Sequence, residues 1–238
     1  MRDRETLVIG DIHSCHEEFN ALLKKISYHK DKHRVVLCGD SIDRGPDPIG
    51  LIHHIQDLEL EMTASNHENK ALRWRKHEAI KELTGTPNPM KDPVPQRKKE
   101  WEALTKFDLK YIANLPPYIL VKDNWVIVHG GLTPRIKLNN QDPETIIRLR
   151  FVDKDTLLPV KTKNKEQPKN SVFWAEAWDQ PYNVVFGHTR FKEPKIFKNK
   201  NNVCVGIDTS CVYGGSLTAY NIDKNEFISV KADKIYYK

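Results

Sequence analysis

The chain has 238 residues, of which 39% are hydrophobic and 29% are charged, the balance of a globular protein with one well-buried domain or two small ones. No apolar run is long enough to cross a membrane as a helix, and the charged N-terminus is unlike a signal peptide, so we expect a cytoplasmic protein. The net charge of +6 is compatible with polyanionic partners such as nucleotides or RNA, but the basic residues cluster in predicted helix faces and loops, where a solvated surface is the simpler interpretation.

The first 65 residues alternate between strand and helix signals. β-branched and aliphatic runs predict strands at 6–9, 34–38 and 60–64, and amphipathic spacing predicts helices at 15–26 and 48–58. Strands that alternate with helices in this way are typical of a parallel sheet with right-handed crossovers.

Residues 69–116 have a different character, because they are polar and charged with helical runs on either side of a break at 84–89. Pro93 and Pro95 exclude one continuous helix. We interpret this region as a helical insertion beside the site described below, and as a natural place for substrate selectivity.

The second half is predicted to be rich in strands. Its signals indicate a hairpin at 118–121 and 125–128 with a turn at 122–124, a short helix over 142–151, and a lysine-rich loop over 153–170. Further strands are expected at 183–186, 204–207, 216–220 and 227–230. We therefore expect an α/β (α+β) fold, a two-sheet β-sandwich flanked by helices, with a mainly antiparallel second sheet facing the first. Residues 1–238 would form one domain, because the candidate ligands come from both halves.

The cysteines give no sign of a metal ribbon, because none of the four forms a CxxC pair. Cys38 and Cys204 lie in apolar runs and are predicted core residues. Cys15 and Cys211 lie near the polar clusters described next, where reactive thiols would be the less favoured interpretation.

Five polar clusters carry the chemistry, and four of them directly follow a predicted strand. Because strand-end loops meet at one edge of a sheet, we expect their side chains to converge. Their carboxylate, carboxamide and imidazole donors suit a pair of divalent transition metals, with Asp40 as the natural bridge. Such a pair would hold a hydroxide between the ions, which would attack phosphorus in line. The clusters are Gly10-Asp11-Ile12-His13, Gly39-Asp40-Ser41-Ile42-Asp43-Arg44-Gly45, Asn66-His67-Glu68, His129-Gly130-Gly131 and Gly187-His188-Thr189.

Each cluster is weak by itself. A lone Asp-x-His or Gly-His is ordinary, and Asn66-His67-Glu68 is also compatible with a polar helix start. Their joint occurrence in this order favours a metal site.

The ordered set resembles the motifs of the calcineurin-like metallophosphoesterases, and more narrowly those of the phosphoprotein phosphatase family, which includes serine/threonine phosphatases and bacterial diadenosine tetraphosphatases. The likeness spans residues 7–220 and implies the fold of that family. It implies that His67 is the general acid, that Asp43 orients it and that Arg44 clamps the phosphate. The alternative for Asp43 and Arg44 is a structural ion pair. The implied ligands are Asp11, His13 and Asp40 for the first metal, and Asp40, Asn66, His129 and His188 for the second.

Two positions depart from the family pattern, because Ser14 and Ser65 stand where glycine is usual. Neither supplies a ligand. Serine lacks the freedom of glycine at positive φ, so these changes put the local backbone in question more than the chemistry.

The substrate is less well defined. The segments 148–151 and 207–215 resemble diadenosine tetraphosphatases, whereas the clusters at 39–45 and 66–68 are closer to protein phosphatases. Arg150, and less strongly Arg148, is expected to contact a second phosphate; the alternative is that one of them only pairs with a carboxylate on the helix. Base stacking on Trp174, Trp178 or Tyr213 is less favoured than packing.

The resulting hypothesis is a dinuclear metal phosphoesterase that hydrolyses phosphate ester or anhydride bonds, with activity like that of a bis(5'-nucleosyl)-tetraphosphatase. Manganese is the expected metal, and iron, zinc, cobalt or nickel are alternatives. The alternative functions are a protein serine/threonine phosphatase and a nucleic-acid end phosphatase. A catalytically inactive binding module is disfavoured, because every implied ligand is present. The expected partner is a dinucleoside polyphosphate or a phosphoprotein, and not a membrane.

Overall fold

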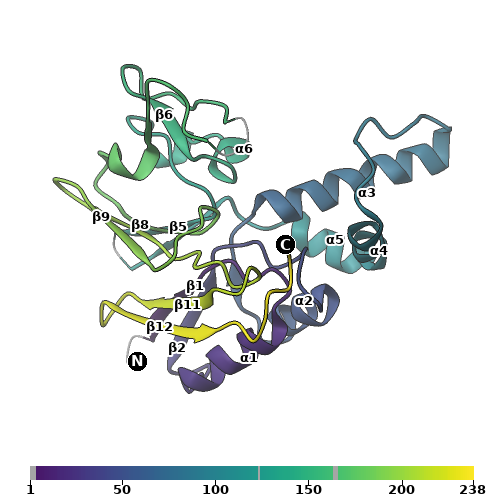
Figure 1. Ribbon diagram of the computed structural model, residues 1–238, viewed down its shortest axis with the longest axis horizontal. Coiled ribbons are helices and arrows are strands. Elements are labelled where there is room, and N and C mark those ends of the chain that lie inside the picture. Colours follow the sequence, from purple (N-terminus) through teal and green to yellow (C-terminus); the bar gives the residue numbers. More distant parts are fainter. Residues whose placement is uncertain (1–3, 123, 163–165) are drawn as a thin grey trace.

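Two five-stranded sheets lie at the centre of the computed structural model, which describes residues 4–122, 124–162 and 166–238 (Figure 1). The first sheet contains β1 (Glu5–Ile9), β2 (His33–Leu37), β3 (Glu61–Met62), β11 (Ser216–Asn221) and β12 (Glu226–Lys231), in the order β12-β11-β1-β2-β3. The second contains β4 (Tyr118–Val121), β5 (Trp125–Val128), β8 (Asn183–Phe186), β9 (Lys195–Lys198) and β10 (Val203–Gly206), in the order β4-β5-β8-β10-β9.

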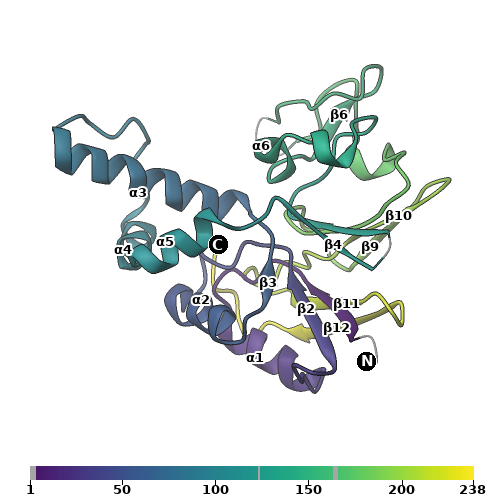
Figure 2. The ribbon, with the colours of Figure 1, turned by 180° about the vertical axis from the view of Figure 1, so that it is seen from behind.

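The first half of the chain folds as predicted. β1 and β2 pair in parallel with Leu7 opposite Val35, and β2 pairs in parallel with β3. The crossovers are α1 (His16–Lys25) and α2 (Pro48–Asp57), which cover the outer face of this sheet (Figures 1 and 2). Phe19 and Leu22 of α1 are fully buried in the core beneath it.

The second half follows a different path from the one predicted. The strands near 216–220 and 227–230 are β11 and β12, and they join the first sheet, where Ala219 lies opposite Ile9. The second sheet is mixed rather than mainly antiparallel, because β8 pairs in parallel with both β5 and β10. Its central strands are buried on both faces, an environment in which parallel strands are common and in which alternation gives no sign of direction.

The inner faces of the two sheets pack against each other, which confirms the predicted sandwich. This layer contains Val8 and Val36 from the first sheet and Ile127, Val185 and Val205 from the second, all 0–1% exposed. The strand ends of both sheets are therefore held close together.

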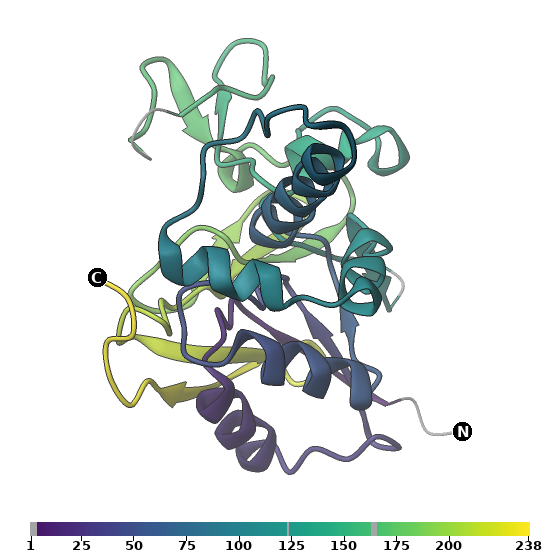
Figure 3. The same cartoon turned by 90° about the vertical axis from the view of Figure 1, so that its right-hand side faces the viewer.

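The helical insertion contains three helices that lie together on one side of the sheets (Figure 3): α3 (Asn66–Thr84), α4 (Pro95–Ala103) and α5 (Lys106–Ala113). The predicted break near 84–89 is confirmed, because α3 ends at Gly85 in the left-handed conformation. α3 begins at Asn66, three residues earlier than expected. Trp74 and Trp101 pack inside this unit with ring centroids 5.7 Å apart.

A smaller lobe follows β5. The helix expected over 142–151 is only a single turn, α6 (Pro143–Ile146). The loop expected over 153–170 connects the two strands of a small sheet. Its strands are β6 (Phe151–Asp153) and β7 (Ser171–Phe173), and the lobe also contains the 3₁₀ turns η1 (Leu138–Asn140) and η2 (Trp174–Glu176). Trp174 and Trp178 are buried in the core of the second sheet and are not surfaces for a base.

Some predictions lie partly outside the described residues. The β4–β5 hairpin is confirmed, but its turn includes Asp123, and the N-terminus and the lysine-rich loop include 1–3 and 163–165. All four cysteines are free and buried. No helix among the described residues has the length and apolarity needed to span a membrane.

Candidate metal and phosphate site

A cavity of about 780 Å³ lies where the strand-end loops of the two sheets meet. Five of the six predicted metal ligands line it, and the sixth, His129, is fully buried behind them. The fold therefore brings the predicted ligand loops together around one cavity. The five lining ligands are Asp11, His13, Asp40, Asn66 and His188.

Asp40 lies at the centre of this arrangement. Its Oδ1 lies 3.3 Å from His129 Nε2, and its Oδ2 lies 3.4 Å from His13 Nε2. Burial alone would raise the pKa of Asp40, but the nearby imidazoles of His129, His67 and His13 bring it well below its ordinary value. Asp40 thus offers one oxygen to each side of the site.

His129 is oriented by the backbone of the first sheet. Its Nδ1 donates to the carbonyl oxygen of Cys38 at 2.8 Å, so Nε2 of the neutral ring carries the lone pair. Burial lowers the pKa of His129, which favours this neutral form. Nε2 lies 2.9 Å from Asn66 Oδ1 and close to Asp40 Oδ1, so three acceptor atoms face one another. A cation would satisfy all three.

His13 repeats this arrangement on the other side of Asp40. Its Nδ1 donates to the carbonyl oxygen of Ile42 at 3.2 Å, which leaves Nε2 free to act as an acceptor. Burial lowers the pKa of His13 to about 3. Arg44 Nη1 donates to this Nε2 at 2.6 Å.

Asp11 and His188 connect the two sheets. The backbone N–H of His188 lies 3.1 and 3.0 Å from the two carboxylate oxygens of Asp11. Nε2 of His188 is buried and has no hydrogen-bond partner. Burial, together with the charges of Asp208 and Asp40, raises the pKa of Asp11 well above its ordinary value. Bound cations would relieve this repulsion.

The loops that carry these ligands adopt an unusual backbone. His13, Asp40 and His188 all lie in the left-handed region, with φ of 48°, 50° and 63°. Such conformations cost non-glycine residues free energy and are concentrated at functional sites. Ser14 shares the conformation with φ of 61°, so it adopts the geometry for which glycine is usual.

Ser65, the other departure, needs no left-handed backbone. It has an extended conformation with φ of −134° and caps α3, where its Oγ accepts from the backbone N–H of His67. The same hydroxyl donates to Asp40 Oδ1 at 2.6 Å and also contacts Glu68. The glycine requirement lies instead at Gly39, which has φ of 87° and whose Cβ would come within 2.7 Å of Ser65 Cβ. Serine therefore adds a hydrogen bond to Asp40 at this position.

His67 and Asp43 form a buried pair. His67 Nδ1 lies 2.6 Å from Asp43 Oδ2, and its Nε2 faces Arg44 Nη2 at 2.8 Å. Arg44 therefore contacts two histidines and not Asp43, and the alternative of an Asp43–Arg44 ion pair finds no support. His67 Nε2 lies 3.9 Å from Asp40 Oδ2, which places it next to the ligand group.

Asp43 has two further partners, which the sequence did not indicate. Trp101 Nε1 donates to Asp43 Oδ1 at 2.8 Å, and Arg97 Nε lies 3.2 Å from Asp43 Oδ2. Burial alone would raise the pKa of Asp43, but these contacts and His67 lower it overall. Both partners come from α4, more than 50 positions along the chain, so no local signal could have revealed them.

The two arginines of the 148–151 segment have separate environments. Arg150 lines the cavity and donates to the carbonyl oxygen of His188 at 3.0 Å. Arg148 does not line it, because its guanidinium contacts Glu144 and Asn69. The structure thus brings only Arg150 to the ligands.

Sequence reasoning missed three more residues of the cavity: Asp208, Arg190 and Lys192. Asp208 lies two residues after the end of β10, so the strand-end rule could have found it; burial raises its pKa to about 6. Arg190 and Lys192 follow His188 on one loop. Arg190 lies over the ring of Tyr213 at 4.2 Å from its centroid, and Arg44 lies 5.6 Å from the same centroid, so arginines rather than a base occupy that ring.

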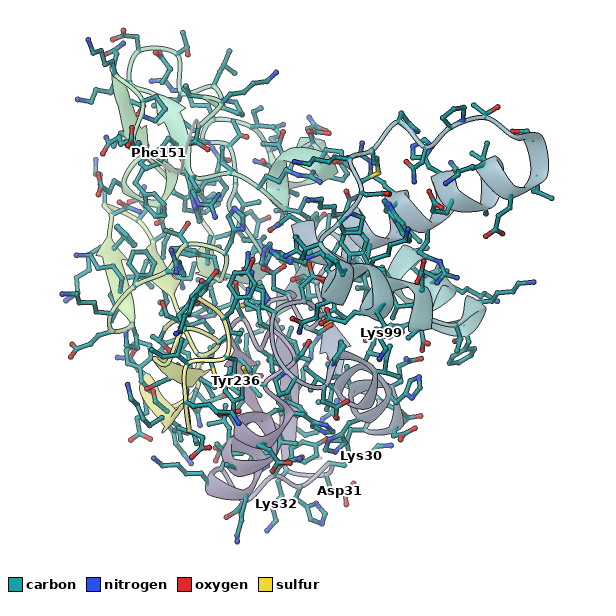
Figure 4. All side chains as sticks on the ribbon, turned by 45° about the vertical axis from the view of Figure 1, so that its right-hand side comes forward. Lys30, Asp31, Lys32, Lys99, Phe151 and Tyr236 are labelled. Atoms are coloured by element: carbon teal, nitrogen blue, oxygen red, sulfur yellow. The ribbon has the colours of Figure 1, made fainter. Side chains whose placement is uncertain are left out.

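The cavity is distant from much of the basic surface. Figure 4 shows Phe151, which lines the cavity, and Lys30 and Lys32, which lie at the far end of the molecule. The basic side chains that line the cavity are Arg44, Arg150, Arg190 and Lys192.

The donor set fits two divalent cations. Asp40, His129 and His188 form one group whose ligand atoms lie within 4.8 Å of one another, and His13, Asp40 and His67 form another. Asp40 belongs to both, as expected for a bridge. The second group contains His67 where Asp11 was expected, and His67 Nδ1 is held by Asp43.

Comparisons with known proteins agree with this geometry. The family model described as calcineurin-like phosphoesterase matches residues 5–206. The chain is 28% identical to the bis(5'-nucleosyl)-tetraphosphatase PrpE of Oceanobacillus iheyensis, covering 94% of this chain and 90% of the relative. It is also 28% identical to PrpE of Bacillus subtilis, covering 96% and 95%.

Solved structures show the same fold. One that is described, provisionally, as a diadenosine tetraphosphatase superposes with a TM-score of 0.79 at 25% identity and covers 96% of this chain and 94% of that one. A serine/threonine phosphatase from Saccharomyces cerevisiae shares the fold at 17% identity, with a TM-score of 0.55 over 98% of this chain and 80% of that one. The chain belongs to the calcineurin-like phosphoesterase family and is a metallophosphoesterase.

Proposed function

We propose that this enzyme uses two divalent cations to hydrolyse dinucleoside tetraphosphates asymmetrically. The main support is the charge of the cavity, where four cationic side chains surround one ligand cluster. A single phosphate monoester needs fewer, whereas a chain of phosphates could engage all of them. They are Arg44, Arg150, Arg190 and Lys192.

The ligands divide as the family motifs suggest. Asp11, His13 and Asp40 would hold one ion, and Asp40, Asn66, His129 and His188 the other. When bound, the ions would supply charge neutralisation at the phosphoryl oxygens and an activated water. Manganese is our expected metal, with iron, zinc, cobalt or nickel as alternatives, because this mixed oxygen and imidazole set suits all of them.

Arg44 would bind the phosphate under attack. In the structure its two terminal nitrogens donate to the Nε2 atoms of His13 and His67. A cation at His13 Nε2 would compete with the first of these bonds and free that donor. The planar guanidinium would then be able to meet two phosphoryl oxygens.

His67 would act as the general acid. Asp43 accepts the Nδ1 proton of His67, which orients the ring so that Nε2 faces the ligand group. Nε2 accepts from Arg44 Nη2 in the structure, so Arg44 would first have to leave Nε2 for the phosphate before that atom could carry a proton. Nε2 would then give a proton to the leaving oxygen as the bond from phosphorus to that oxygen breaks. Mutation of such acids commonly costs about 10² to 10⁴ in rate.

Arg150, Arg190 and Lys192 would bind the more distant phosphates. Arg150 is fixed by the His188 carbonyl, and Arg190 is placed on Tyr213. The lobe formed by β6 and β7 contributes Phe151 to the cavity wall. These residues would select a substrate that continues beyond the phosphate under attack.

A substrate panel tests the proposal. The purified protein is stripped with a chelator and reconstituted with Mn²⁺, Fe²⁺, Zn²⁺, Co²⁺ or Ni²⁺, and then assayed on diadenosine tetraphosphate, p-nitrophenyl phosphate, a phosphopeptide and end-phosphorylated RNA. We expect no activity without metal, restoration by Mn²⁺, and the highest kcat/KM for diadenosine tetraphosphate, with ATP and AMP as products. Preference for the phosphopeptide or the RNA would contradict the proposed substrate, and inactivity with every metal would contradict the proposed function.

Arg148 provides a matched control for the phosphate contacts. R150A should raise the KM for diadenosine tetraphosphate about tenfold, because it removes a charge-assisted bond. R148A removes the same charge two residues away, from a side chain held by Glu144, and should change KM less than about twofold. Equal increases in KM for R150A and R148A would mean that the loss of positive charge in general, and not a contact of Arg150 with phosphate, causes the change.

A further inference from the structure

Helix α4 of the helical insertion contacts the site at the Asp43 carboxylate. Asp43 is 0% exposed, and it lies in the left-handed region with φ of 73°. Its two oxygens contact three side chains: Trp101 donates to Oδ1, His67 donates to Oδ2, and Arg97 forms an ion pair with Oδ2. Only His67 belongs to the proposed catalytic machinery, so the other two contacts need an explanation.

Trp101 and Arg97 act from one face of α4. They are four residues apart, which places them one above the other on the helix. The Arg97 guanidinium also lies 5.9 Å from the centre of the Trp101 ring. The two side chains therefore support each other as well as Asp43.

The position of α4 is in turn set by α3. Arg75 of α3 donates to the carbonyl oxygens of Trp101 and Glu102 at 2.7 and 2.6 Å, which satisfies the end of α4. His67 lies in the first turn of α3. Helix α3 thus carries the His67 imidazole. It also fixes the position of α4, whose side chains contact Asp43, the partner of that imidazole.

We propose that Trp101 and Arg97 are positioning residues that keep the Asp43 carboxylate aimed at His67, so that the insertion takes part in proton donation and not only in substrate selectivity. The inference rests on the proposed function of His67. Without the indole N–H, Asp43 Oδ1 would be a buried acceptor with no partner, and the carboxylate could rotate away from His67 Nδ1. Proton donation would then weaken, while substrate binding and the metal ligands stayed in place.

Dependence on the leaving group separates this role from a purely structural one. Phenolate is a poor leaving group and benefits from a proton, whereas p-nitrophenolate leaves readily without one. W101F keeps an aromatic ring in the core but removes the N–H. We expect it to lower kcat for phenyl phosphate about tenfold, with little change in KM, and to lower kcat for p-nitrophenyl phosphate much less.

W74F is the matched control. Trp74 is 1% exposed, packs against Trp101, and its Nε1 has no hydrogen-bond partner, so the same substitution changes packing without removing a bond. It should change kcat for both esters less than about twofold. Equal rate losses in W101F and W74F, or equal losses for both esters in W101F, would overturn the proposal.

R97Q provides a second variant that leaves the core untouched. It should lower kcat for phenyl phosphate selectively, by about threefold, because one charged contact to Asp43 is lost. If W101F does not fold, an R97Q enzyme with equal losses for both esters would overturn the proposal. Inactivity of the wild-type enzyme with every metal would remove the proposed function as well, whereas an active wild-type enzyme with ester-independent losses removes only this inference.

Discussion

The ligand loops and the α3–α4 unit meet at one cavity but are built in different ways. Asp11, Asp40 and His188 lie in short loops at strand ends, and their positions follow from how the two sheets face each other. Asp43 also lies in a loop after a strand, but its side chain accepts a hydrogen bond from Trp101, which is 58 positions away on a helix of the insertion. One half of the site is thus placed by sheet topology and the other half by packing between helices.

This difference separates two kinds of function. In the proposed mechanism the strand-end loops place acceptor atoms around the cations, so small shifts there would alter affinity for metal. The helical unit would place the proton donor, so shifts there would alter turnover. The predictions below test this division, beginning with the largest effect.

Replacing one histidine from each half gives the strongest test. H67A should lower kcat by about 10² to 10⁴ with two ions still bound, because its role is proton donation. H188A should instead lower metal affinity at least about a hundredfold, because His188 Nε2 is a buried atom with no protein partner. Turnover and metal content measured on the same samples distinguish the two. Loss of metal from the H67A variant would mean that His67 is a metal ligand, which would contradict the proposed separation between metal binding and proton donation.

A stability measurement tests Ser65, which connects helix α3 to the ligand Asp40. Ser65 caps α3 and donates to Asp40, so S65A should lower the free energy of unfolding by about 2 kcal/mol. T63V removes a buried hydroxyl that has no partner, two residues earlier, and should be neutral or stabilising. Urea unfolding of both variants makes the comparison, and equal losses would mean that the Ser65 bonds contribute nothing specific.

The smallest effect concerns Glu100 on α4. Burial, and next the charge of Asp43, raises the pKa of Glu100 from 4.5 to about 7. The folded protein therefore binds a proton more tightly than the unfolded chain does, and Glu100 destabilises the fold increasingly as the pH rises from 4.5 through 7. E100Q should be more stable than the wild type by about 1 kcal/mol at pH 8, after allowance for solvent screening at this half-buried group, and similar at pH 4.5.

Thermal unfolding across this pH range measures the gain, and E102Q controls for loss of an exposed carboxylate on the same helix. A gain that does not depend on pH would contradict the raised pKa of Glu100. It would also weaken the view that Asp43 is ionised beside it.

The sequence was sufficient for the parts of the fold and site that depend on local pattern. The parallel β1–β2–β3 arrangement and the convergence of the ligands followed from strands that end in polar residues. The exchange of β11 and β12 into the first sheet could not be predicted, because alternation does not say which sheet an antiparallel pair joins. Ser65 looked like a missing glycine, but its extended backbone is that of an ordinary helix N-cap, and the pattern Ser65-Asn66-His67-Glu68 is a local signal for one. Its bond to the distant Asp40 could not be predicted.

The contacts around Asp43 lay beyond prediction for a related reason. Trp101 has helical spacing with its neighbours, which predicts burial but not the direction of its N–H. The sequence favoured Arg150 over Arg148 as a phosphate contact but could not say which of them pairs with a carboxylate. The short α6 turn answers this, because it brings Glu144 against Arg148.

The bond between Asp11 and His188 has a consequence for how the protein responds to its surroundings. These residues lie 177 positions apart, in loops that follow a strand of each sheet, and their contact closes most of the chain into a loop. Ions shared by such distant ligands would bind the folded chain and not the unfolded one, and so act as cross-links. At a free metal concentration one hundred times its dissociation constant, each ion would add about 2.7 kcal/mol to the free energy of unfolding. The lifetime of the enzyme in the cell would then depend on metal supply, and scarcity would remove the protein as well as its activity.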